Sequence, residues 1–266
     1  MLITGNKGFV GSYIENYFEN AYDCYGISRD DNIDIRLYEN LEKLDISPEI
    51  VIHTVASFSD DVQSSFETNV IGTLNICKYA KEKQSKHLIL ISSLSVYERE
   101  ENEYFNLYGR TKKQAEEIAE SYCEQHNICL TILRLSQVYD DCGIARKNQG
   151  MLYYFIDMIK KNKRIEIFGE KNPLRNYIHI DYLSLVIEDV IKKEKSGIYN
   201  IIEKKNHTII EIAYMIFDIL NIKPEIEFLV DKPNIGNVYI PTESYDNEVQ
   251  SISLRNGIER IINYEK

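Results

Sequence analysis

The first half of the chain alternates short runs of β-branched and aliphatic residues with longer stretches in which apolar residues recur every three or four positions. The short runs predict strands, and the longer stretches predict helices. A run such as Leu88–Ile91, apolar at every position, is typical of a parallel strand covered on both faces. The expected strands are Met1–Thr4, Cys24–Ile27, Val51–Thr54, His87–Ser92 and Leu130–Leu135, and the expected helices are Val10–Asn20, Phe66–Lys83 and Tyr108–His126.

The pattern changes after Ser136, where short strands and helices follow one another without the regular alternation of the first half. Thr208 and Glu211 have the spacing of a capping box, which predicts the start of a helix that runs to Leu220. The run Gly197–Ile202 is apolar enough to join the main sheet. The other expected elements are the helices Met151–Lys161, Tyr182–Lys193 and Leu254–Ile262 and the strands Ile165–Phe168 and Tyr177–Ile180.

A glycine loop, Gly5-Asn6-Lys7-Gly8-Phe9-Val10-Gly11, joins the first expected strand to the first expected helix. Glycines at this spacing let the chain turn sharply, let its backbone approach a pyrophosphate and let the helix pack closely on the strand. The start of the helix then offers N–H groups and a positive dipole end to the phosphates. The loop therefore predicts a nicotinamide dinucleotide site. The residues expected to hold the pyrophosphate are Gly5, Gly8, Phe9, Val10 and Gly11.

The fold class that follows is α/β: a Rossmann-type doubly wound parallel sheet with a smaller, interleaved C-terminal substrate-binding lobe. Residues 1–137 and 181–205 are assigned to the dinucleotide-binding domain. Residues 138–180 and 206–266 are assigned to the small lobe. No flexible linker divides the two, so we expect them to interleave rather than to be joined end to end.

The end of the second strand predicts which dinucleotide binds. NAD sites usually place a carboxylate there for the ribose 2′-hydroxyl, whereas this chain places Arg29, whose charge and fork geometry suit a 2′-phosphate. Asp30 and Asp31 follow directly, and a shift of one or two residues would put a carboxylate at the ribose instead. Arg29 favours NADP, with NAD as the alternative.

Composition and charge exclude several classes of protein. No apolar run approaches the roughly 20 residues that cross a bilayer, and no basic leader with an apolar centre precedes the glycine loop, so a cytoplasmic protein is expected. A net charge of −11 would repel polyphosphate, so no nucleic acid partner is expected. Five cysteines without a Cys-x-x-Cys pair predict reduced thiols rather than disulfides or a metal site.

Tyr108 and Lys112 are four residues apart and therefore share one face of their expected helix. A nearby ammonium favours phenolate, so Lys112 is expected to lower the pKa of Tyr108 and to make it a proton donor or acceptor near neutral pH. The strand before them ends in hydroxyl side chains, among them Ser93, where parallel sheets bind their ligands. These residues predict acid/base chemistry beside the dinucleotide.

Together these features resemble the extended short-chain dehydrogenase/reductases, and in particular the NAD(P)-dependent nucleotide-sugar epimerase/dehydratase family. The resemblance covers nearly the whole chain. It rests on seven ordered motifs: GNKGFVG, VIHTVAS, NVIGTLNICKYAK, ISSLSVY, YGRTK, ILRLSQVY and IFGEKNPLRNYIHIDY, the last followed by GIYNI.

The resemblance implies a role for each matching residue. Ser93 would hydrogen-bond the C4 oxygen of a sugar, Tyr108 would be the acid/base, and Lys112 would bind the nicotinamide ribose. The remaining implied contacts are Asp34 and Ile35 beside the adenine, Ala56 and Asn69 in the cofactor cleft, and Gln137 and Arg175 at the substrate, with Arg175 directed to the phosphates.

Three departures from the family pattern bear on the reaction. The 4,6-dehydratases follow the active-site hydroxyl with an Asp-Glu pair that eliminates water, and Leu94-Ser95 cannot replace it, which disfavours dehydration. The loop from Tyr97 to Tyr108 is short and lacks prolines. The triplets Tyr139-Asp140-Asp141 and Arg175-Asn176-Tyr177 stand where relatives read Y-G-P and R-D-[FY], and both are expected to border the sugar pocket.

Three functions remain open from the sequence. The first is NADPH-dependent reduction of a 4-keto (6-deoxy) nucleotide sugar, the second is 4-epimerisation with tightly held NAD, and the third is a dinucleotide-sensing regulator without turnover. The resemblance also implies a homodimer formed through the helices Phe66–Lys83 and Tyr108–His126. Apolar dimer surface is expected at Ile71, Ala80, Ala115 and Tyr122.

Overall fold

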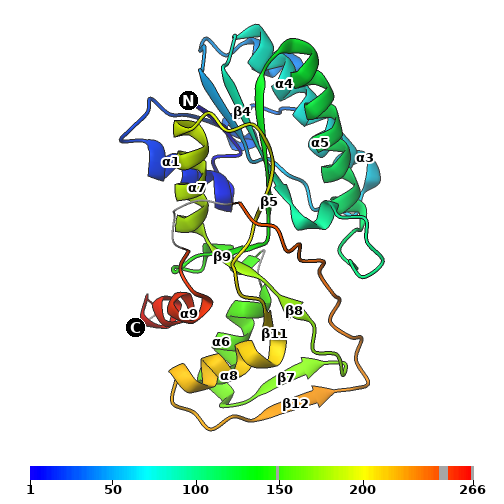
Figure 1. The fold of residues 1–266 in the computed structure, drawn as a ribbon, viewed down its shortest axis with the longest axis vertical. Helices are drawn as coiled ribbons and strands as arrows, with labels where there is room; N and C mark the ends of the chain where they lie inside the picture. Colours follow the sequence, from blue (N-terminus) through cyan, green and yellow to red (C-terminus); the bar gives the residue numbers. More distant parts are fainter. Residues whose placement is uncertain (148–149, 246–250, 265–266) are drawn as a thin grey trace.

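A computed structural model of the chain describes residues 1–147, 150–245 and 251–264, and its centre is a six-stranded, fully parallel sheet (Figure 1). The strands lie in the order β10-β5-β4-β3-β1-β2, so the direction of winding reverses beside β1. Ligands bind at such a reversal, beyond the carboxyl ends of the strands. The strands are β1 (Leu2–Thr4), β2 (Tyr25–Ile27), β3 (Ile50–His53), β4 (His87–Ser93), β5 (Cys129–Leu135) and β10 (Gly197–Ile201).

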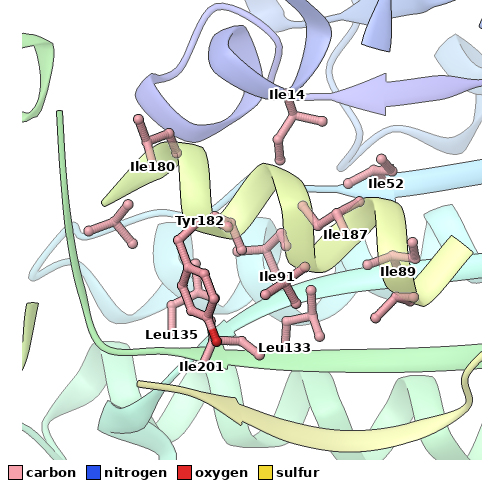
Figure 2. Packing of buried hydrophobic residues seen from close by; sticks show 14 of the residues in the cluster. Ile14, Ile52, Ile89, Ile91, Leu133, Leu135, Ile180, Tyr182, Ile187 and Ile201 are labelled. Carbon is pink, nitrogen blue, oxygen red and sulfur yellow. The ribbon is translucent and has the colours of Figure 1, made fainter. Parts of the chain in front are cut away.

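Helices cover both faces of this sheet, which confirms the predicted doubly wound α/β fold. Helices α1 (Phe9–Phe18) and α7 (Ile180–Lys192) pack on one face, and α4 (Gly72–Glu82) and α5 (Leu107–His126) pack on the other. Successive strand residues point to opposite faces, so Leu88 and Ile89 enter different cores. Figure 2 shows the core beneath α7, where isoleucine and leucine side chains from the strands meet the helix.

The helix expected from Phe66 begins four residues earlier than the periodicity predicted. It comprises α3 (Val62–Phe66), a π-helical segment η2 (Glu67–Ile71) and α4. Asp61 caps α3 by accepting a hydrogen bond from the Ser64 N–H at 2.7 Å. A capping carboxylate before a helix was the overlooked signal. The wider π turn, a form frequent at functional sites, holds Asn69.

The small lobe is built from three two-stranded sheets and three helices among the described residues. The capping box is confirmed: the Thr208 hydroxyl accepts from the Glu211 N–H, and the Glu211 carboxylate accepts from the Thr208 N–H. The strand pairs are β6 (Gln137–Tyr139) with β9 (Tyr177–His179), β7 (Ile165–Phe168) with β12 (Ile226–Leu229), and β8 (Leu174–Arg175) with β11 (His207–Thr208). The helices are α6 (Gly150–Asn162), α8 (Ile209–Ile219) and α9 (Leu254–Tyr264).

Four short elements complete the described chain, and the sequence pattern predicted none of them. They are η1 (Arg29–Asp31), α2 (Tyr38–Glu42), η3 (Leu94–Val96) and η4 (Ile144–Lys147). Within the assigned small lobe, residues 148–149, 246–250 and 265–266 lie outside the described part of the chain. No helix in the described part is long and apolar enough to span a membrane.

The apolar dimer surface expected on the two long helices needs correction. Ala80 and Ala115 are fully buried, because α4 and α5 pack against each other and against the sheet. The exposed apolar residues of this region are instead Val62, Phe66 and Ile118. Small residues on a helix often mark close packing with a neighbour, which the sequence does not distinguish from an oligomer interface.

Candidate active site

The glycine loop between β1 and α1 has the backbone geometry that a pyrophosphate site requires. Gly5 adopts a positive φ of 78°, which favours glycine. A Cβ atom on Gly11 would lie 2.2 Å from the Gly5 carbonyl oxygen, so only glycine lets α1 approach the loop this closely. Gly8 precedes α1 without a side-chain cap, and Phe9 and Val10 form its first turn. The cradle therefore fits a dinucleotide pyrophosphate on the start of α1.

The end of β2 presents Arg29 to solvent in the short helix η1. The nearby carboxylate of Asp31 accepts a hydrogen bond from the Ser28 hydroxyl at 2.7 Å. Farther along, Arg36 donates to both oxygens of Asp34 and holds the pKa of that carboxyl below its usual range. The neighbouring Ile35 is buried.

Asn69 is 1% exposed, and both the oxygen and the nitrogen of its side-chain amide form hydrogen bonds within the protein. Its oxygen accepts from the Ser57 N–H at 2.7 Å, and its nitrogen donates to the Ser57 carbonyl and to the Thr111 hydroxyl. Ser57 follows Ala56 in the loop after β3, whereas Thr111 lies on α5. Asn69 therefore fixes the loop after β3 against α5, the helix that carries Tyr108.

The first turns of α5 bring the three expected catalytic residues to the end of β4. Asn106 caps the helix by accepting from the N–H groups of Tyr108 and Gly109. A Cβ atom on Gly109 would lie 2.3 Å from the Ser95 carbonyl oxygen, so glycine allows this close approach. Ser93, the last residue of β4, hydrogen-bonds to the Tyr108 side chain.

Burial controls the protonation of Tyr108 and Lys112. It raises the pKa of Tyr108 to about 12, and the hydrogen bond from Ser93 opposes this shift. Burial lowers the pKa of Lys112 to about 8, and the negative charge of Glu116 opposes that shift. The Lys112 ammonium donates to the Ile91 carbonyl at 2.6 Å. The expectation that Lys112 lowers the pKa of Tyr108 is wrong for this arrangement, because desolvation outweighs any effect of the ammonium.

Arg175 lies at a cavity of about 310 Å³ in the small lobe, which Gln137 also lines. Arg175 is 1% exposed, and its guanidinium donates to the carbonyls of Leu174 and Gly236, each at 2.7 Å. Within the described part of the chain, no carboxylate forms an ion pair with it. Two carbonyls and the Tyr104 ring, whose centroid is 5.8 Å away, surround the positive charge, which suits an anionic ligand; Glu166 is an acidic residue in the lining of the same cavity. Tyr104, Tyr154 and Phe168 add aromatic surface to the cavity.

Comparison with known proteins decides which family this arrangement represents. Residues 1–201 match the model of the NAD dependent epimerase/dehydratase family. The chain belongs to this family. Membership makes it an NAD(P)-dependent enzyme of the extended short-chain dehydrogenase/reductase type, which favours the enzymatic alternatives over a regulator.

Relatives within the epimerase/dehydratase family differ in the reactions their names describe. The chain is 29% identical to a putative UDP-glucose 4-epimerase of Methanocaldococcus jannaschii, over 100% of this chain and 98% of that protein. A Thermotoga maritima UDP-glucose 4-epimerase solved with UDP-glucose superposes with a TM-score of 0.80 at 19% identity, covering 99% and 97% of the two chains. A Bacillus anthracis dTDP-4-dehydrorhamnose reductase solved with NADP superposes with a TM-score of 0.80 at 21% identity, covering 98% of this chain and 96% of that chain. At these identities, the two structures show a shared fold.

Asp140, Asp141 and Asn176, the residues at which the two triplets depart from the family pattern, are not among the residues that line the cavity beside Arg175. Asp140 is fully buried and contacts Tyr13 on α1 at 3.0 Å, so it joins the small lobe to the helix of the glycine loop. Asn176 is also buried and bonds to the backbone of Glu203 in both directions. Asp140 thus puts a buried hydrogen-bonding carboxylate where relatives have glycine, and Asn176 puts a buried amide where they have aspartate.

Two residues near Tyr108 were missed by the sequence analysis. The ring of Phe58 stacks on that of Tyr108 with centroids 4.3 Å apart and an interplanar angle of 20°. Glu116 lies two turns beyond Tyr108 and is 1% exposed. The continued four-residue spacing from Tyr108 through Lys112 to Glu116 was an available signal, whereas nothing local predicted the contact of Phe58.

Proposed function

We propose that this enzyme reduces a 4-keto (6-deoxy) nucleotide sugar with NADPH. The arrangement that supports this reaction best is Tyr108 on α5 beside Ser93 at the end of β4, where a pKa of about 12 keeps the phenol protonated at neutral pH. Bound nicotinamide would supply the hydride to the C4 carbon. Tyr108 would donate its proton to the carbonyl oxygen, which Ser93 orients by a hydrogen bond. Lys112 would hold the ribose hydroxyls.

The proposed preference for NADP rests on the end of β2. Arg29 is exposed there and offers its guanidinium to a 2′-phosphate, while the carboxylate of Asp31 accepts a hydrogen bond from the Ser28 hydroxyl. Arg29→Ser should weaken NADPH binding about 10- to 100-fold, the range for a hydrogen bond to a charged group, and leave NADH binding unchanged. Equal effects on both cofactors would contradict this preference.

The proposed contacts to the nucleotide part of the substrate centre on Arg175 in the small lobe, assigned above to residues 138–180 and 206–266. Arg175 would bind the diphosphate, because its buried charge is surrounded by two carbonyls and the Tyr104 ring and forms no ion pair with a carboxylate among the described residues. The buried hydroxyl of Ser136, in the link between β5 and β6, has no hydrogen-bond partner among the described residues and lies next to Gln137, which lines the same cavity. The aromatic cavity beside Arg175 would receive the rest of the nucleotide.

Turnover with a panel of nucleotide sugars tests the reaction. Purified protein should oxidise NADPH in the presence of a 4-keto-6-deoxy nucleotide sugar. Tyr108→Phe removes the proton donor and retains the ring stacked on Phe58, so kcat should fall about 10²- to 10⁴-fold. Unchanged turnover in this variant would overturn the assigned role of Tyr108.

A second candidate is 4-epimerisation, which uses the same residues with NAD held throughout the cycle. The full-length similarity to the putative UDP-glucose 4-epimerase of M. jannaschii favours it. Cofactor that co-purifies as NAD, and conversion of one hexose epimer into the other without net NADPH use, would identify an epimerase rather than a reductase.

We also propose that two copies pair through α4 and α5. Val62, Phe66 and Ile118 expose apolar side chains on α3 and α5 in that region. Sedimentation at micromolar concentration should show a dimer, and Ile118→Glu should shift the population toward monomer. A wild-type chain that remains monomeric would refute the proposal.

A further inference from the structure

One face of α5 contacts three consecutive residues at the end of β4. The contacting helix residues are four apart, so they form a single stripe. The pairs are Tyr108 with Ser93, Lys112 with the Ile91 carbonyl, and Glu116 with the Ser92 hydroxyl. The stripe therefore contains a third buried polar residue beyond Tyr108 and Lys112.

Glu116 is held by an arginine from the neighbouring strand. Arg134 on β5 donates its Nε to both carboxylate oxygens at 3.1 Å and its Nη2 to Oε2 at 2.6 Å. The Glu116 side chain is only 2% exposed, and the guanidinium also lies 4.9 Å from the ring of Tyr97. A buried ion pair is a costly way to stabilise a fold, because hydrophobic residues of similar volume often do as well. The ion pair between Glu116 and Arg134 lies one helical turn from Lys112, which points to a functional role for this pair.

Charged and titratable groups lie near Lys112 on its own helix and on strands of the sheet. Tyr108 and Glu116 lie on its own helix, Arg134 comes from β5, and His53 comes from β3. Burial lowers the pKa of His53 to about 3, so this side chain is neutral. Tyr108 is also neutral at physiological pH. Glu116 is therefore the negative charge that offsets the burial of the Lys112 ammonium.

We propose that Glu116, oriented by Arg134, is a positioning residue that keeps Lys112 in its charged form and fixes α5 against the end of β4. Without this carboxylate, the buried ammonium would lose its proton near neutral pH. The neutral amine would bind ribose hydroxyls more weakly and would no longer favour the phenolate that proton donation leaves on Tyr108. This consequence for turnover rests on the proposed function.

The protonation of Lys112 can be measured without substrate or cofactor. Protein labelled with [ε-13C]lysine shows a titration for each lysine, and the signal of Lys112 is the one lost in Lys112→Arg. Glu116→Gln should lower this midpoint by about 1 pH unit or more, given opposite charges one helical turn apart in a partly screened interior. Loosened packing alone would admit water and raise the midpoint instead. A midpoint that stays unchanged or rises overturns the proposal.

A matched control and a rate measurement separate charge from structure. Glu120→Gln makes the same charge change one turn farther along α5, on an exposed residue, and should leave the Lys112 midpoint within about 0.3 pH unit of the wild type. In Glu116→Gln, the pH at which kcat falls on the alkaline side should decrease by as much as the Lys112 midpoint does. At lower pH, kcat should stay near the wild-type value. Loss of kcat at every pH would indicate a merely structural role. If the wild type turns over no nucleotide sugar, the proposed function fails, but the lysine titration still decides the role of Glu116.

A second pair of variants covers the case in which Glu116→Gln does not fold. Arg134→Gln and Arg134→Lys both lose the bidentate contact, but only the first removes the positive charge. The Lys112 midpoint should therefore be about 0.5 pH unit higher in Arg134→Gln than in Arg134→Lys. Equal midpoints in the two variants would overturn the charge coupling.

Discussion

Replacing Asp140 with asparagine should weaken the junction between the small lobe and the helix of the glycine loop. Asp140 is fully buried just after β6, and burial alone would raise its pKa. Hydrogen bonds to its carboxylate outweigh burial and hold the pKa below its usual range. The donors are the Cys142 thiol, the Tyr153 and Tyr13 hydroxyls, and the N–H groups of Ile144 and Ala145.

The size of the effect follows from this hydrogen bonding. Each carboxylate oxygen of Asp140 accepts from one backbone N–H, Oδ2 from Ile144 and Oδ1 from Ala145, both at 2.9 Å. Asparagine retains one acceptor oxygen, so in either orientation its NH2 group faces a backbone N–H that has lost its partner. An unsatisfied buried donor costs about 1–3 kcal/mol, and the remaining bonds lose their charge-assisted strength. The variant should therefore be less stable by about 3 kcal/mol.

Urea unfolding, monitored by circular dichroism and by tyrosine fluorescence since the chain has no tryptophan, measures this loss. The control is Asp157→Asn, which removes a half-exposed ion pair with Arg146 and should cost less than about 1 kcal/mol. The contribution of Asp140 is present above its unfolded pKa of about 3.9 and disappears as pH falls through its lower native pKa. The difference between wild type and Asp140→Asn should thus shrink in strong acid. A loss below 1 kcal/mol at pH 7 would refute this account.

Three further predictions concern the glycine loop, α9 and a buried histidine. Gly11→Ala places a Cβ atom 2.2 Å from a loop carbonyl and should abolish the enhancement of NADPH fluorescence on binding, whereas Gly150→Ala, with open space at its Cβ position, should bind normally. Gly257→Ala puts a Cβ atom 1.8 Å from the Tyr139 hydroxyl oxygen and should lower the free energy of unfolding by about 2 kcal/mol; an unchanged urea midpoint would contradict the packing of α9. Burial lowers the pKa of His179, but two neighbouring aspartates outweigh burial and raise this pKa above its usual value. The charged imidazole should therefore stabilise the fold fully below pH about 6.5, and this contribution should be lost as pH rises through the higher native pKa. His179→Gln should therefore cost more stability at pH 6 than at pH 9, and equal losses at both would exclude the charged form.

Much of the fold could be predicted from the sequence because its signals are local. The period of apolar residues identified all six strands of the main sheet, and the capping-box spacing placed the start of α8 at Thr208. The glycine spacing predicted a tight strand-to-helix turn, since a Cβ atom at Gly11 would meet the loop backbone. Such features depend on residues a few positions apart, so neighbouring sequence is enough to specify them.

The site depended on contacts between residues far apart in the chain, which only the tertiary structure decides. Arg134 reaches Glu116 across 18 positions, and Tyr13 reaches Asp140 across 127. The sequence placed Tyr108 beside Lys112 correctly but predicted a lower pKa for the phenol, whereas the fold raises it to about 12. The spacing of two residues on a helix determines that they are neighbours. Protonation depends on how much water the surrounding chain removes, and that is a property of packing from every side.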